Sequence, residues 1–372
     1  MRPARSLRSS WRRAGSLWRD LQGRRRTATT ATGLLRPGIY RPLSETLWAR
    51  RGARIPVHLL RTKGGSPSGS AEVSMPYRLL RLVAGTFPVL GARRGRTAEL
   101  VVVSFDGGIV VLDQAGGKVH RTYGTGPLTP ADEDRRRQFI EHVSAPQFRF
   151  HSDGAVIEEE LVEGDYLGDL AHEERVGLIT TLVEQCATLT AAYSSDAPSV
   201  TDRDLEALLH EVDVPPGFAR AWGRSSTQWF SPRTPWIPTP REANAKNIVV
   251  RPDGRPAPID LGDLQVDPYF IYPVGILIAA GSTVMRRFLS GDLDRSFALL
   301  LAAAGHSWGG TPQERRGLLL ARIAYAGHKD SLVEGVVDRT IFSASLLRRW
   351  EEVRDVFDDI PAHRAPAPPE RR

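Results

Sequence analysis

The hydrophobic and polar positions along the chain change their period near residue 165. Before it, Val- and Ile-rich segments separated by Asp-Gly or Gly-Gly pairs are typical of an antiparallel meander. After it, apolar residues recur every three to four positions, which is typical of amphipathic helices. Predicted strands cover residues 99–105, 109–112, 118–123, 147–150 and 155–161, and predicted helices cover 130–143, 173–193, 204–212, 276–289, 297–304, 312–326 and 339–357.

This order of elements predicts an α+β protein with two lobes. A small antiparallel β lobe carrying one helix precedes a larger helical lobe. The predicted segments are a basic low-order extension at 1–74, the β-rich lobe at 75–164, the helical lobe at 165–360 and a disordered Pro/Arg tail at 361–372.

Composition limits the class of protein. A chain of 372 residues can bury the cores of two lobes. The single cysteine, Cys186, excludes an internal disulfide and fits a reducing cytoplasm. Apolar runs are too short to span a bilayer. The abundance of Arg, Ala and Gly indicates a GC-rich bacterial genome. Oligomeric state is not predicted.

The positive charge is concentrated at the amino-terminal end. Residues 1–75 carry 16 of the 50 Lys and Arg but 3 of the 43 Asp and Glu, so their net charge is +13 and that of the remainder is −6. Leu7, Trp11 and Trp18 share one helical face among arginines. Three interpretations stay open: a disordered tail or a start at Met75, a peripheral contact with an anionic membrane surface, or, less favoured, nucleic-acid binding.

The chemistry-bearing stretch lies at 240–263. A predicted hairpin with the turn Arg-Pro-Asp-Gly at 251–254 brings Asn247 close to Asp260, thirteen residues later. An amide oxygen and a carboxylate are hard ligands suited to a nucleotide-bound Mg²⁺. Glu242 lies five residues before Asn247, where a kinase catalytic loop places its base.

These residues resemble the aminoglycoside phosphotransferase and choline kinase branch of the protein-kinase-like superfamily. The resemblance covers residues 75–357. The stretch PREANAKN at 240–247 is similar to the family's His-Gly-Asp-Leu-His-Pro-x-Asn, and IDLGD at 259–263 is similar to its Ile-Asp-Phe/Trp-Gly-Asp. The chain departs from the pattern by lacking His-Gly and by having Glu242 where the family has Asp.

The resemblance implies a protein-kinase-like fold, ATP and Mg²⁺ as cofactors, and a role for each matching residue. Glu242 would be the catalytic base, Asn247 a catalytic-loop residue and metal ligand, and Asp260 the other metal ligand. The phosphate-binding cation would be Arg121 or Lys118. Its helix partner would be Glu133, with Asp134 and Glu141 as alternatives. The segment EELVEG at 159–164, with Glu160 and Gly164, resembles the link whose backbone binds adenine.

The predicted function is an ATP-dependent phosphotransferase in the cytoplasm, with a peripheral position at the membrane as an alternative. It would transfer the γ-phosphoryl group to a hydroxyl of a small molecule or of a peptide Ser/Thr. The altered catalytic loop and the basic extension are the reasons for an alternative hypothesis. In it the protein is a catalytically weak kinase-like (pseudokinase) module that binds or scaffolds a partner.

Overall fold

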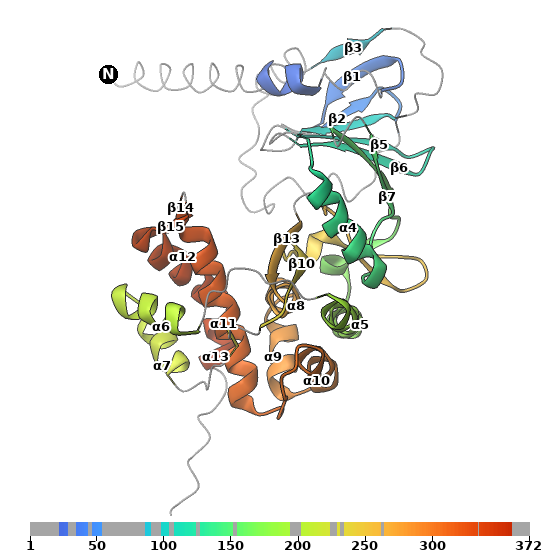
Figure 1. The fold of residues 1–372 in the computed structure, drawn as a ribbon. Coiled ribbons are helices and arrows are strands. Elements are labelled where there is room, and N and C mark those ends of the chain that lie inside the picture. Colours follow the sequence, from blue (N-terminus) through green and yellow to red (C-terminus); the bar gives the residue numbers. More distant parts are fainter. Residues whose placement is uncertain are drawn as a thin grey trace, which may run out of the picture. The chain divides into compact units, whose positions relative to one another are not determined.

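The computed structural model describes the chain in segments and divides it into two compact units (Figure 1). The described residues are 22–28, 35–43, 47–53, 86–90, 98–103, 108–123, 127–151, 155–193, 202–223, 229–230, 234–261, 264–333 and 335–358. We call the unit that comprises Met1–Asp134 and Pro146–Val162 the β unit, and the unit that comprises Arg135–Ala145 and Glu163–Arg372 the helical unit.

An antiparallel sheet of eight described strands forms the β unit, in the order β3-β1-β2-β4-β5-β6-β8-β7 (Figure 1). The strands are β1 (Gly38–Pro42), β2 (Leu47–Arg50), β3 (Phe87–Val89), β4 (Leu100–Val103), β5 (Ile109–Asp113), β6 (Lys118–Thr122), β7 (Phe148–His151) and β8 (Val156–Glu160). The strands predicted between residues 99 and 161 are confirmed.

The centre of this sheet follows from its β-branched residues. In the β4–β5 pair Val101 faces Val111, and both side chains are buried. Val and Ile fit the pleated surface of a half-buried strand. At the end of β5 the Asp113 carboxylate accepts a hydrogen bond from the Gly116 amide at 2.8 Å, and Gly117 has φ +64°, a left-handed conformation that favours glycine. This turn fixes the register of β5 against β6.

The prediction that residues 1–74 form a low-order extension is wrong for the strands β1 and β2, which belong to the sheet. Tyr40 and Trp48 are fully buried, and Tyr40 stacks on Phe87 with ring centroids 5.4 Å apart. Burial of these large aromatic rings holds the segment despite its basic composition. The amphipathic positions Leu7, Trp11 and Trp18 lie outside the described residues.

Nine labelled helices of the helical unit follow one another along the described chain (Figure 1). They are α5 (His172–Ala192), α6 (Asp202–Glu211), α7 (Pro216–Trp222), α8 (Ile271–Ala279), α9 (Ser282–Ser290), α10 (Asp294–Ala303), α11 (Pro312–Ser331), α12 (Arg339–Glu351) and α13 (Arg354–Asp358). Helix α4 (Pro130–His142) starts in the β unit and continues in the helical unit. The α+β class is confirmed.

Short strands complete the helical unit. They are β9 (Asp165–Tyr166), β10 (Trp236–Pro240), β11 (Ile248–Val250), β12 (Pro256–Pro258), β13 (Leu264–Pro268), β14 (Leu332–Val333) and β15 (Val336–Val337), with 3-10 turns η3 (Leu167–Asp169) and η4 (Ala245–Asn247). They pair as β10-β13, β12-β11-β9 and β14-β15.

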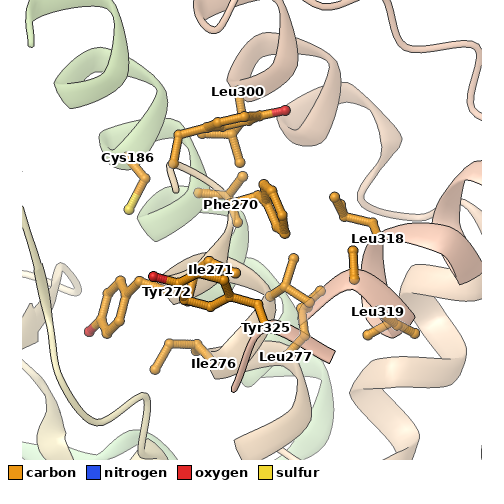
Figure 2. Packing of buried hydrophobic residues seen from close by; sticks show 14 of the residues in the cluster. Cys186, Phe270, Ile271, Tyr272, Ile276, Leu277, Leu300, Leu318, Leu319 and Tyr325 are labelled. Carbon is orange, nitrogen blue, oxygen red and sulfur yellow. The ribbon is translucent and has the colours of Figure 1, made fainter. Parts of the chain in front are cut away.

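Helices α8 and α11 supply much of the core of the helical unit, where Phe270, Ile276 and Leu277 pack near Leu318 and Leu319 (Figure 2). All five side chains are fully buried. Full burial of such side chains contributes about 1.5–3 kcal/mol each. Helix α11 is therefore a rigid support for any polar group that it carries.

Two predicted helices are each interrupted in the structure. The segment 276–289 lies in α8 and α9, which are separated at Gly281 with φ +101°. The segment 339–357 lies in α12 and α13. Continuous apolar spacing does not reveal such breaks, because the two pieces bury faces of similar composition. The described part of the chain contains no helix that is long and apolar enough to cross a membrane.

Candidate active site

The predicted hairpin is formed by β11 and β12, with Ile248 opposite Pro258. Its turn is closed by Asp253, whose carboxylate accepts a hydrogen bond from the Arg255 amide at 3.1 Å, and by Gly254 at φ +81°. At the open end the Ile259 amide donates to the Asn247 carbonyl at 2.7 Å. Asn247 and Asp260 therefore stand at the base of the hairpin, as the sequence predicted.

Asp260 is held in an unusual conformation. Among the described residues it is the one non-glycine residue with positive φ, at 65°, and its side chain is exposed. Asp tolerates this region better than most residues, but such a conformation still costs free energy and is concentrated at functional sites. Next to it, the buried Arg136 of α4 donates from Nη2 to the Leu261 carbonyl at 2.6 Å. This contact holds the backbone that carries the Asp260 carboxylate.

The loop before the hairpin is also held by local hydrogen bonds. The Asn244 side chain caps η4 by accepting from the Lys246 amide at 3.0 Å, and the Asn247 amide donates to the Asn244 carbonyl at 2.9 Å. Ala245 is buried, and Gly168 lies close to it. Glu242, at the start of the loop, is exposed. The loop thus presents Glu242 and Asn247 from a fixed backbone.

Gly164, predicted in the adenine-binding link, has a structural function in the helical unit. Its φ is +146°, and a Cβ there would lie 1.8 Å from the Val250 carbonyl oxygen. Only glycine allows this close approach to β11. The residue therefore determines how the link passes beside the hairpin. Its role in adenine binding stays a prediction.

The other predicted nucleotide-binding residues lie in the β unit. Lys118 Nζ pairs with Glu158 Oε1 at 2.5 Å, and this hydrogen bond is the main cause that lowers the pKa of Glu158. Arg121 Nε pairs with Glu159 Oε2 at 3.4 Å.

Both cations therefore bind carboxylates of the adjacent strand β8. The amide of Glu160 donates to the Gln147 carbonyl at 2.9 Å, and Glu133 lies in the first turn of α4. The predicted site residues are thus divided between the two units.

A cavity of about 480 Å³ opens beside Glu242, within the helical unit. Its apolar wall includes Ile271, Tyr272 and Tyr325. A volume of this size suits a small ligand or a peptide side chain. The charged residues that line it are Arg241, Glu242, Asp267, Arg322, Lys329, Asp330 and Arg349.

One wall of the cavity is anchored by Asp267 on β13. Its carboxylate accepts hydrogen bonds from Lys329 Nζ at 2.5 and 2.7 Å and from the Tyr325 hydroxyl at 2.9 Å. Thr239 on β10 adds a bond at 3.0 Å. Burial, followed by the nearby Asp267, raises the pKa of Tyr325, so its hydroxyl stays protonated and remains a donor.

Sequence reasoning missed the cavity residues of α11, which are Arg322, Tyr325, Ala326, Lys329 and Asp330. They follow Glu242 by about eighty residues, and no motif links them to it. A signal was present, however. Arg322 interrupts the apolar run LLLARIAYA, where a charged side chain is unexpected on a buried face.

Comparison with known proteins found solved structures that are similar to this chain. No family model matches the chain, and no curated protein matches it. Three similar structures are a macrolide 2'-phosphotransferase from Brachybacterium faecium, a choline/ethanolamine kinase family protein from Mesorhizobium loti, and a thermostable mutant of an aminoglycoside phosphotransferase in complex with AMP-PNP and hygromycin B.

The identities are 14%, 12% and 14%, and the TM-scores are 0.39, 0.36 and 0.41, in the same order. The alignments cover 64%, 68% and 71% of this chain, and 88%, 86% and 92% of the other chains. These values are too low to transfer an acceptor or an activity, so the function proposed below rests on the chain's own residues.

Proposed function

We propose that the protein is an ATP-dependent phosphotransferase that moves the γ-phosphoryl group to a hydroxyl of a small molecule or of a peptide Ser/Thr. One observation carries this proposal. Glu242 lines a cavity and lies five residues before Asn247, which stands with the strained Asp260 at the base of the hairpin. A base, two oxygen ligands and an acceptor cavity are thereby placed on consecutive parts of one unit.

The donor atoms fit Mg²⁺. Asp260 offers an exposed carboxylate, and the half-exposed Asn247 side chain has no hydrogen-bond partner among the described residues. Mg²⁺ in phosphoryl-transfer sites is bound by one or two protein oxygens, with phosphates and water completing the octahedron. The described residues contain no cluster of three His, Cys, Asp or Glu that could bind a metal alone. Bound Mg²⁺ would neutralise charge on the phosphates.

In the proposed reaction the acceptor oxygen forms a bond to the γ-phosphorus, and the bond from that phosphorus to the β–γ bridging oxygen breaks. ADP leaves with the bridging oxygen, and the acceptor proton passes to the Glu242 carboxylate. Positioning and charge stabilisation dominate such a loose transition state, so a Glu in place of Asp can serve if it reaches the hydroxyl.

The experiment pairs two measurements on the full chain. Calorimetry with Mg·ATP tests nucleotide binding, and radiolabelled ATP tests transfer to a panel of hydroxyl compounds and Ser/Thr peptides. We expect binding and slow turnover, both reduced in Asp260→Ala. Absence of nucleotide binding at millimolar ATP contradicts the proposal.

The variant Glu242→Asp separates the enzyme from the alternative module. Restoring the shorter side chain should change the rate of transfer while leaving nucleotide affinity unchanged. Nucleotide binding without turnover in both the wild type and Glu242→Asp would support the pseudokinase interpretation.

A further inference from the structure

The cavity beside Glu242 contains more cationic than anionic residues. Four cationic residues, Arg241, Arg322, Lys329 and Arg349, and three anionic residues, Glu242, Asp267 and Asp330, line it. A ligand in the cavity meets those charges that are not already neutralised by a neighbour. The partners of each cation therefore decide which chemistry the cavity recognises.

Two of the cations are already paired. Lys329 binds Asp267, which is 3% exposed in its side chain, and Arg349 Nη2 binds Asp330 Oδ2 at 2.7 Å. Asp330 also accepts hydrogen bonds from the Ser345 hydroxyl at 2.5 Å and from Arg348 at 3.1 Å. These pairs fix α11 against β13 and α12, and they leave little positive charge for a ligand.

Arg322 differs from both. Its Nε donates to the Ile271 carbonyl at 2.9 Å, and among the described residues its guanidinium forms no ion pair. The side chain is half-buried. Burial, followed by repulsion from Arg349, lowers the pKa of Arg322 to about 10. The carboxylates that attract Arg322, Asp267 and Asp330, are bound to other cations, so burying its guanidinium is costly and an incoming anion would relieve that cost.

The backbone of α8 makes room for this side chain beside the catalytic loop. A Cβ on Gly275 would lie 3.1 Å from Arg322 Nε and 2.5 Å from the Ala243 Cβ. Glycine therefore lets Arg322 and Ala243 approach the same point of the helix. Ala243 directly follows Glu242, and Glu242, Ala243 and Arg322 all line the cavity.

We propose that Arg322 binds an anionic group of the acceptor, so that the substrate is a hydroxyl compound that also carries a carboxylate or a phosphate. This inference rests on the proposed function and deepens it. The anionic group would lie against Arg322, and a hydroxyl a short distance along the molecule would face Glu242. A polycationic acceptor is disfavoured, since it would place its charge beside an unpaired guanidinium.

The first test measures binding without turnover, with the nucleotide site saturated by Mg·ADP. Calorimetry compares glycerol, which is neutral, with glycerate and glycerol 3-phosphate, which add a carboxylate or a phosphate to a similar skeleton. We expect the two anions to bind more tightly than glycerol. Arg322→Met should weaken them about 10-fold or more, which is the loss of one charge-assisted hydrogen bond. Whichever anion binds more tightly shows whether the site prefers a carboxylate or a phosphate.

Two further variants control the interpretation. Arg322→Lys keeps the charge but not the planar donor fork, so it should retain part of the affinity and also shows that the site folds. Arg348→Met removes the same charge from a side chain that is 66% exposed and outside the cavity lining. The affinities of the two anions should be the same in this variant as in the wild type. Equal affinities of the anions for wild type and Arg322→Met, or binding of glycerol as tight as that of glycerate and glycerol 3-phosphate, would overturn the proposal.

The second test measures phosphoryl transfer to the same three compounds. Arg322-dependent anion binding without transfer to any compound would leave the anion subsite standing and count against the phosphotransferase. Transfer to the neutral compound at a rate that Arg322→Met leaves unchanged would support the phosphotransferase and count against the anion subsite. The two proposals can therefore fail separately.

Discussion

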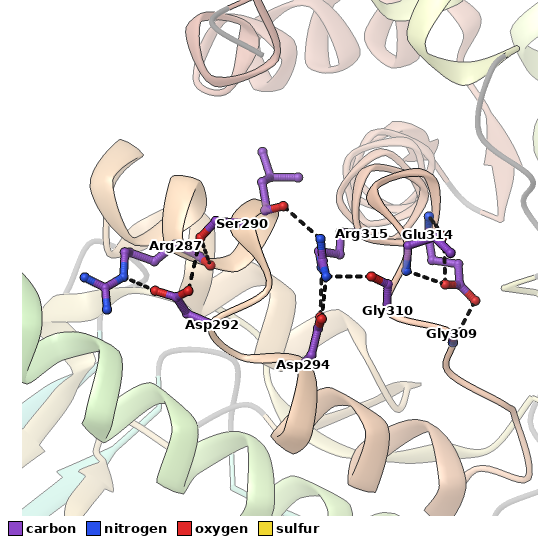
Figure 3. Close-up of polar contacts among 10 residues, drawn as sticks. Arg287, Ser290, Asp292, Asp294, Gly309, Gly310, Glu314 and Arg315 are labelled. Carbon is purple, nitrogen blue, oxygen red and sulfur yellow. Dashed lines mark hydrogen bonds and ion pairs between the residues drawn. The ribbon is translucent and has the colours of Figure 1, made fainter. Parts of the chain in front are cut away.

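Two arginines on helix α11 stand about two turns apart and have opposite environments. Arg315 binds both carboxylate oxygens of Asp294 and donates to the Leu289 and Gly310 carbonyls at 3.0 and 2.5 Å (Figure 3). Arg322 donates to one backbone carbonyl and has no ion pair among the described residues. We call the region of Arg315, Asp294 and Gly310 the closed corner. The region of Glu242, Asp260 and Arg322 is the open site.

The comparison shows that Arg315 has a structural role, whereas the charge of Arg322 is available to a ligand. In the closed corner every contact is made within the protein, and the Arg315 side chain is 9% exposed. Removing such a partner leaves the other charge buried and unpaired. In the open site Glu242 and Arg322 line a cavity, and the exposed Asp260 is held at positive φ, a conformation that costs free energy. A guanidinium without an ion pair, carried on a rigid helix, is the arrangement expected where a ligand completes the site.

The largest expected effect belongs to the open site. Asp260→Asn keeps a residue that tolerates positive φ but removes the carboxylate. Transfer should fall about 10³-fold, or about 4 kcal/mol in the activation barrier, because charge stabilisation dominates this chemistry. The measurement is kcat/KM with radiolabelled ATP, alongside the thermal midpoint. A variant that loses stability but keeps its activity would show that Asp260, like Arg315, has a structural role.

The matching change in the closed corner is Arg315→Met. It should lower the free energy of unfolding by about 3 kcal/mol, the lower end for a buried ion pair, because Asp294 keeps partial contact with solvent. Denaturant unfolding measures this loss, and activity per folded molecule should be unchanged. A selective loss of transfer with full stability would break the distinction between the two regions.

A smaller effect is expected for Glu242→Gln, which preserves shape but cannot accept the acceptor proton. Transfer should fall about 10²-fold, the lower range for a general base. Nucleotide affinity by calorimetry should not change, and Glu242→Asp serves as the charged control. Full activity in Glu242→Gln would show that positioning alone carries the reaction.

The smallest effect has the opposite sign. Arg322→Met should raise the free energy of unfolding by about 1 kcal/mol, since it removes a half-buried charge that forms no ion pair among the described residues. The folded-state pKa of Arg322, about 10, lies below the ordinary 12.5, so the unfolded state binds more protons above pH 10. Wild-type stability should therefore gain relative to Arg322→Met as pH rises through about 10. Urea unfolding at several pH values measures the difference, and a destabilised variant would indicate a structural arginine.

The sequence by itself determined the elements whose signals are local. The turn Pro-Asp-Gly at 252–254 and its flanking β-branched residues specified the hairpin, and with it the positions of Asn247 and Asp260. The period of apolar residues specified strands 99–123 and helix α11. The α+β class followed, because strand and helix periods occupy different parts of the chain.

Tertiary structure alone decided what distant segments share. It placed β1 and β2 in the sheet, because burial of Tyr40 and Trp48 outweighs a basic composition. It also brought Arg322 to the cavity of Glu242, eighty residues away, and paired the Asp267 carboxylate with Lys329 rather than with Arg322. Which charge is neutralised depends on packing between helices and strands, and no local pattern encodes that choice.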